Sequence, residues 1–174
     1  MLLKNSNLKI HNIVYFSFLV ISVIWITLIF AAPYFFSQGG DLAEIGTYIY
    51  LFFSKCCHQI DSRSFKIFGY KLAVCSRCTT IYLGFFLSVI LYPFIRKIRN
   101  REMPNIWILI FPVLLLAADT LLDLFEIYKN GFVSRSITGF LIGFVLPLFL
   151  IPGFINFVFG SVKIFVNNNK NMNE

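Results

Sequence analysis

Four long apolar runs constrain this chain more than any other feature of its sequence. A bilayer core of about 30 Å needs roughly 20 helical residues at about 1.5 Å each, and runs near this length cover residues 13–32, 79–95, 106–125 and 137–159. Of the 174 residues, 58% are hydrophobic and only 13% are charged, whereas a soluble domain carries about 25% charged residues. We therefore expect an all-α integral membrane protein, a single domain folded as a four-helix bundle.

Basic residues near the ends of the runs predict the orientation. With four spans, three groups fall on one side: Lys4 with Lys9, a dense cluster in residues 96–101, and Lys163 with Lys170. The opposite side still holds seven basic residues, so the density of Lys and Arg favours this side more than their number does. Cytoplasmic flanks are rich in Lys and Arg, so we expect a multi-pass protein of the cell (inner) membrane with both termini in the cytoplasm. The net charge of +7 does not indicate nucleic-acid binding, because the basic residues lie between apolar runs and not on one face.

Glycine and proline residues predict packing and helix ends within the runs. Gly139 and Gly143 form a G-x-x-x-G motif in the fourth run, which is typical of close helix packing. Pro33 follows the first run directly, so we expect the first helix to end there.

Residues 34–78 form the one long connection between the runs, and loops of this length in compact proteins are usually functional or disordered. Asp41 followed by Glu44 matches a helix-capping pattern, and apolar residues then recur at near-helical spacing. This pattern predicts a short helix that lies in the membrane interface or packs on the bundle. Residues 65–74 partly alternate around Gly69, which predicts a small hairpin.

The cysteines of this loop indicate its chemistry. Cys75 and Cys78 form a C-x-x-C motif, and seventeen residues separate Cys57 from Cys75, of which the first is His58. A C-x-x-C turn lets two thiolates converge on one ion, and a second pair brought in by a hairpin completes a tetrahedron. Cys57, His58, Cys75 and Cys78 are therefore a candidate Cys3His site. Soft ligands of this kind favour zinc, with iron or copper(I) as alternatives.

Other interpretations of these residues remain open. Adjacent residues do not comfortably chelate one tetrahedral ion, so Cys56 or Asp61 is an alternative to either member of the first pair. Cys75 and Cys78 also begin the second run, where helix N–H groups and Arg77 stabilise a reactive thiolate. This arrangement fits a membrane thiol-disulfide oxidoreductase coupled to quinone. The simplest alternative is that the cysteines are structural disulfides or inert thiols.

Acidic residues interrupt the third run. Residues 106–118 span only about 20 Å as a helix, so the helix cannot cross a core of about 30 Å without taking in Asp119. Asp119, Asp123 and Glu126 share one helix face and should face protein or water, because an Asp at mid-span costs about 2.5–3.5 kcal/mol. The face is either a polar site or an ion pair that fixes the bundle. The candidate partners are all arginines: Arg63 and Arg77 of the loop, and Arg135 at the start of the fourth run.

Several short motifs follow one another between about residues 50 and 145: Cys57-His58-Gln59, Arg63-Ser64-Phe65, Cys75-Ser76-Arg77-Cys78 with Ile81-Tyr82-Leu83-Gly84, Asp119, Arg135, and Thr138-Gly139 with Gly143. Together they resemble a prokaryotic family of small predicted membrane proteins, domain of unknown function 2085. The resemblance implies an integral membrane protein and no established activity. The family has Gly where this chain has Thr80, and the resemblance does not extend to Cys56 and Asp123. Three matching thiols and an imidazole suit a metal better than two disulfides.

The leading hypothesis is a membrane protein whose loop holds a Cys/His metal site, with zinc preferred, over an intramembrane pocket of Asp119 and Arg135. The partners we expect are the lipid bilayer and a metal ion. The alternatives are the thiol oxidoreductase, and a small transporter or assembly partner in which the carboxylates matter and the cysteines only hold the loop.

Overall fold

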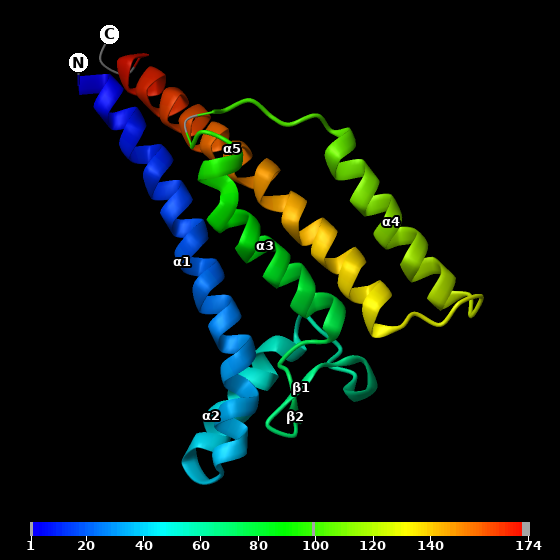
Figure 1. Cartoon of the computed structure of the whole chain (residues 1–174). Coiled ribbons are helices and arrows are strands. Elements are labelled where there is room, and N and C mark those ends of the chain that lie inside the picture. The colour runs from blue at the N-terminus through cyan, green and yellow to red at the C-terminus, as the bar shows by residue number, and fades with distance from the viewer. Residues whose placement is uncertain (1, 99, 172–174) are drawn as a thin grey trace.

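The computed structural model describes residues 2–98 and 100–171. Four long helices run alternately in opposite directions: α1 (Leu2–Gln38), α3 (Ser76–Ile95), α4 (Trp107–Leu124) and α5 (Phe132–Asn171) (Figure 1). Each contains a segment long and apolar enough to cross a membrane, at residues 10–38, 76–95, 107–124 and 132–161. The expected all-α membrane architecture with four spans is therefore confirmed.

Helices α3 and α5 run parallel and form the tightest contact of the bundle. A Cβ atom added at Gly139 would lie 2.6 Å from the Arg77 carbonyl oxygen, and one added at Gly143 would collide with the Ile81 carbonyl oxygen. Gly84 presents the reciprocal contact, because its Cβ position lies 2.5 Å from the Phe140 carbonyl oxygen. The G-x-x-x-G motif therefore packs closely against α3, as the sequence predicts.

Helix α1 continues through Pro33 to Gln38, so the expectation that this proline ends the helix is wrong. The reason is the short helix α2 (Gly40–Ser54), which folds back against the last turns of α1. A Cβ atom at Gly46 would lie 2.8 Å from the backbone nitrogen of Phe36, so the two backbones nearly touch. This packing stabilises helical turns that the proline alone would weaken.

The reversal between α1 and α2 depends on glycine. Gly39 and Gly40 have φ values of 71° and 55°, in the left-handed region that glycine adopts without steric cost. No side-chain hydrogen bond caps the start of α2, so the cap that Asp41 predicts is not formed. The short helix itself is present and packs on the bundle.

A small hairpin follows α2 and a 3-10 turn at Asp61–Arg63. Strands β1 (Lys66–Ile67) and β2 (Tyr70–Lys71) pair antiparallel, with Lys66 opposite Lys71. Phe68 and Gly69 between them have φ values of 56° and 81°, and two positive values are typical of the tight turn whose twist matches a hairpin. The predicted hairpin is confirmed.

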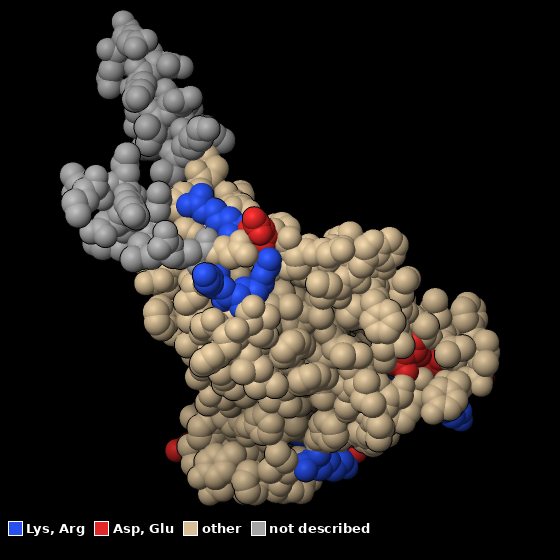
Figure 2. All heavy atoms as spheres, turned by 45° about the horizontal axis from the view of Figure 1, so that its top comes forward, with Lys and Arg blue, Asp and Glu red and all other residues tan. Residues whose placement is uncertain are grey.

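The surface separates into charged ends and an uncharged middle. Figure 2 shows a broad band of uncharged residues between basic residues near one end and further charged residues at the other. The described ends of α1 and α5 lie together, opposite the loop that joins α1 to α3 (Figure 1). The loop, the start of α3, the end of α4 and the start of α5 therefore gather at one membrane boundary.

We predict that Gly143→Leu destabilises the bundle by about 1–3 kcal/mol, the usual cost of overpacking a tight contact, because the new side chain must separate α5 from Ile81. Gly160→Leu is the matched control on the same helix, since no atom lies within 4 Å of its Cβ position. Thermal unfolding in detergent measures both. Equal midpoints for the two variants would show that α3 and α5 do not approach this closely.

Candidate metal centre

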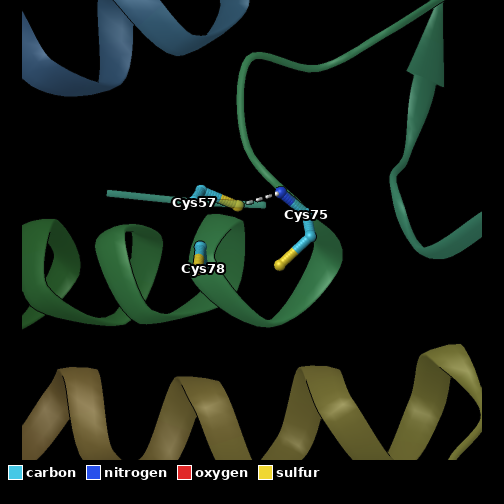
Figure 3. A group of neighbouring side chains, drawn as sticks. All are labelled: Cys57, Cys75 and Cys78. Atoms are coloured by element: carbon cyan, nitrogen blue, oxygen red, sulfur yellow. Dashed lines mark hydrogen bonds between the residues drawn. The ribbon is translucent and has the colours of Figure 1, made fainter. Parts of the chain in front are cut away.

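Three cysteines from separate segments converge at the loop end of the bundle. Cys57 follows α2, Cys75 immediately precedes α3, and Cys78 lies in the first turn of α3. Their sulfur atoms all lie within 4.8 Å of one another, and Figure 3 shows them around the space between the loop and α3. A tetrahedral ion with metal–sulfur bonds of about 2.3 Å needs sulfurs about 3.8 Å apart. Shifts of at most about 1 Å would therefore form a three-thiolate site.

The amide of Gln59 brings the two ends of the loop together. Its Nε2 atom donates hydrogen bonds to the Tyr50 carbonyl oxygen at 2.7 Å and to the Ala73 carbonyl oxygen at 2.8 Å. The first acceptor lies in α2, close before Cys57, and the second lies close before Cys75. One side chain thus joins the segments that carry two of the clustered cysteines.

Two further contacts hold the same junction. Lys71 donates from its ammonium group to the Gln59 carbonyl oxygen at 2.7 Å, and the Tyr50 hydroxyl donates to the Lys71 carbonyl oxygen. Burial raises the pKa of Tyr50 to about 12, so its hydroxyl keeps the proton that this hydrogen bond requires. Gln59 has a φ of 49°, which turns the chain sharply just after Cys57.

An apolar cluster packs against the segment that carries Cys75. Leu72, Ala73 and Val74, which lead into Cys75, are almost completely buried, at 1%, 0% and 0% exposure. They pack with Ile29 of α1 and Phe53 of α2. Because these segments are anchored in the core, the loop cannot carry Cys75 far from Cys57 without exposing apolar surface.

The surroundings of Cys57 favour a thiolate. Its sulfur accepts hydrogen bonds from the backbone nitrogens of Cys75 at 3.1 Å and Gln59 at 3.5 Å. Hydrogen bonds from the Cys75 and Cys78 side chains, and then from these two backbone groups, hold the pKa of the Cys57 thiol far below its ordinary value, against the opposing effect of burial. Metals bind the thiolate form of cysteine.

Three other residues considered as ligands lie outside the sulfur cluster. His58 is exposed but lines a cavity of about 240 Å³ that the three clustered cysteines also line. Cys56 is exposed and lines the same cavity. Asp61 is also exposed and pairs with Lys66 of the hairpin at 2.7 Å, which lowers the pKa of its carboxyl group.

Asp119 and Asp123 of α4 pair with arginines next to this cavity. Asp119 is 8% exposed and forms an ion pair with Arg77, whose other terminal nitrogen donates to Thr120 at 2.9 Å. Asp123 accepts from Arg135 at 2.9 Å and lies 3.4 Å from a terminal nitrogen of Arg63. These pairs connect α4 to α3, to α5 and to the loop.

The partners differ in part from the sequence-based expectation. The sequence predicts a pocket of Asp119 and Arg135, whereas Asp119 pairs with Arg77 and Arg135 pairs with Asp123. Glu126 does not continue the acidic face, because α4 ends at Leu124 and the backbone at Glu126 turns to a φ of 57°.

Three polar residues complete the surroundings of Asp119: Asn130 and Ser134, which the sequence analysis did not single out, and Thr138, which it named only within a family motif. Its carboxylate accepts hydrogen bonds from Ser134 and, at 3.4 Å, from Thr138. Asn130 donates from its side chain to the Asp119 carbonyl oxygen at 2.6 Å and from its backbone to Asp123 at 3.1 Å. Ser134 and Thr138 are four residues apart and so share one helix face. Two hydroxyls on one face of an apolar helix, in a chain with an acidic neighbouring span, are the sequence pattern that could have predicted this contact.

Comparisons with known proteins identify relatives that have no assigned activity. The model of a family described as a predicted membrane protein, DUF2085, matches residues 57–149. An uncharacterized protein of Methanocaldococcus jannaschii, MJ1492, is 37% identical over 159 residues, which cover 89% of this chain and 99% of the relative. An uncharacterized protein of Methanothermobacter thermautotrophicus is 36% identical over 91 residues, 52% of this chain and 77% of that protein. No solved structure matches the chain.

We predict that Asp119→Asn destabilises the protein by about 1.5–3 kcal/mol, the usual worth of a hydrogen bond between charged groups, because it removes the counter-charge of the Arg77 guanidinium, whose side chain is 20% exposed. The double variant Asp119→Asn with Arg77→Gln should lose less than the sum of its single variants. Asp61→Asn is the control, since it breaks an ion pair in which both side chains are more than half exposed and should change little. Thermal unfolding of the four variants measures the coupling, and strict additivity would contradict a direct pair.

Proposed function

Because the chain belongs to the DUF2085 family of predicted membrane proteins, we propose that it is an integral membrane protein that binds a metal ion through Cys57, Cys75 and Cys78. The observation that carries this proposal is the convergence of three sulfur atoms within 4.8 Å. Zinc is the first candidate, because thiolates and imidazoles are its usual ligands, and iron and copper(I) are the alternatives.

An odd number of clustered thiols favours a metal over disulfide chemistry. A disulfide joins two sulfurs, so a third sulfur at the same place would have no covalent partner. A metal ion uses all three. The N–H groups directed at the Cys57 sulfur are also the kind of outer contact that orients a metal-bound ligand.

A tetrahedral ion held by the three thiolates would have a fourth position for a further ligand. His58 is the chain's own candidate for it, since it lines the cavity that the three cysteines also line. Its place next to Cys57 makes a common tetrahedron strained, so a molecule from the cavity is the alternative fourth ligand. A site closed by four protein ligands is structural, and a site with one exchangeable ligand is of the catalytic or transport type.

We also infer the orientation from charge. The described ends of α1 and α5 lie together on the side of the bundle opposite the cysteine loop. The connection between α3 and α4 lies on the same side and includes Arg96, Lys97 and Arg101. An excess of basic residues favours the cytoplasmic face. The termini are therefore assigned to the cytoplasm of the cell (inner) membrane, and the cysteine loop to its outer face.

We predict that the protein purified in detergent carries about one zinc ion per chain, measured by inductively coupled plasma mass spectrometry. Single Ser variants of Cys57, Cys75 and Cys78 should each lose most of the metal, because each removes one thiolate. Cys56→Ser should retain the metal, which makes it the matched control. His58→Ala distinguishes an internal fourth ligand, whose removal lowers metal content, from an exchangeable one.

Two outcomes would contradict the metal-binding proposal. A metal-free wild-type protein that forms a reversible disulfide between two of the three clustered cysteines would favour the thiol oxidoreductase. If the cysteine variants keep normal activity in an uptake assay, while an Asp119→Asn protein that is still folded and has unchanged metal content loses it, the transporter would be favoured.

We predict that Gln59→Ala weakens zinc affinity by about 10–100-fold, the usual effect of losing an outer contact of a metal site. The variant keeps every thiol but removes both hydrogen bonds that join the Tyr50 and Ala73 segments. Gln38→Ala is the control, because the exposed Gln38 amide bonds only the neighbouring Ser37 in the structure as described. Competition with a chromogenic chelator measures both affinities, and equal affinities would exclude this positioning role for Gln59.

A further inference from the structure

We propose that the cavity beside the three cysteines binds an oxyanion, a phosphate or carboxylate group, through Arg63, Arg77 and Arg135. All three arginines line this cavity of about 240 Å³ together with the cysteines. The contacts with the arginines do not require a metal. The position of the anion next to a metal ion's open fourth site rests on the function proposed above.

The charges are arranged so that the cavity is lined by cations. Its lining includes three arginines and, in the part of the chain that the structure describes, no aspartate or glutamate. Asp119 and Asp123 contact the guanidinium groups but do not line the cavity. The carboxylates thus hold the arginines in place and leave the cavity itself to the guanidinium groups.

The hydrogen-bonding capacity of the arginines is only partly used. The Arg135 side chain is 8% exposed, yet its Nε atom is buried without a partner among the described residues, and the same holds for the Arg77 Nε atom. Buried polar groups in native proteins are nearly always hydrogen-bonded, so these guanidiniums are incompletely satisfied by the chain. The two guanidiniums therefore keep donors that the described chain does not use.

Two helix starts add to the positive potential. Cys75, Arg77 and Cys78 stand at the start of α3, and Arg135 is in the first turn of α5. Both ends lie side by side near the cysteine loop (Figure 1). The first turn of a helix carries unpaired N–H groups and a partial positive charge, which favours anions.

The metal centre proposed above would cancel the net charge of the site but not its hydrogen-bond donors. Three guanidiniums against two carboxylates leave one positive charge in excess. Zinc held by three thiolates carries one net negative charge, so the loaded site is close to neutral. Binding then depends on the guanidinium donors, which match the paired oxygens of carboxylate and phosphate, and on the helix starts.

The same chemistry has two sources at a membrane boundary: a free anion and the phosphate of a lipid headgroup. Both present oxygens to the guanidiniums in the same way. The probe is therefore inorganic phosphate in a phosphate-free buffer, first with detergent-solubilised protein and then with protein in nanodiscs of phosphatidylglycerol. Loss of phosphate binding in the nanodiscs assigns the site to the lipid headgroup, and retention assigns it to the free anion.

We predict that phosphate raises the thermal unfolding midpoint of the solubilised wild-type protein in a saturable manner. Arg63→Gln should weaken this binding at least about tenfold, because it removes one charge-assisted donor. The Arg63 side chain is 45% exposed, so the variant should fold. Lys66→Gln removes a loop cation that does not line the cavity, and this control should bind phosphate as the wild type does.

The metal site and the anion site are tested by separate measurements. Zinc content and phosphate binding are measured on the same preparations, before and after treatment with a chelator. Phosphate binding without any zinc would support the anion site and contradict the metal site. In a protein with normal zinc content, two results would overturn the anion site. One is that phosphate has no saturable effect, and the other is that its effect is equal in Arg63→Gln and wild type.

Discussion

The convergence of the cysteines depends on how an irregular loop satisfies its backbone at the edge of a membrane. A buried carbonyl group outside helices and sheets needs a donor, and Ala73, which is fully buried between β2 and α3, carries such a group. The Gln59 amide donates to it and also to the carbonyl oxygen of Tyr50 in α2. The amide that satisfies the Ala73 carbonyl therefore also fixes the distance between the segment before Cys57 and the segment before Cys75. The metal centre that we propose depends on this junction as much as on the sulfurs.

The arginine and aspartate pairs have a matching role on the other side of the cavity. Helix α4 packs mainly against α5, and apolar packing between helices in lipid gains little from the hydrophobic effect. The Asp119–Arg77 pair ties α4 to α3, and Asp123 ties α4 to Arg135 of α5. Polar pairs at the membrane boundary thus set the positions of three helix ends, and the same arginines form part of the cavity wall.

The sequence predicts features that depend on local pattern and misses those that depend on tertiary choice. Run length places the four spans, and the spacing of Gly139 and Gly143 predicts close packing, because each rests on a helical repeat. Nothing in the local sequence distinguishes Arg77 from Arg135 as the partner of Asp119, since that choice depends on how the helices rotate and dock. The path of α1 through Pro33 is likewise a tertiary effect of α2.

The composition of the cavity wall separates two roles for the metal that we propose. A zinc ion that only fastens the loop needs four ligands from the protein. Here the three thiols share a cavity with three arginines, two of which have a buried nitrogen without a partner within the described chain. The aspartates balance the charges of these arginines, but a site that only fastens the loop leaves the two buried Nε donors unsatisfied. The arrangement makes sense where the metal and the guanidiniums act on one anionic ligand together, so the unpaired donors favour an exchangeable fourth position over a closed one.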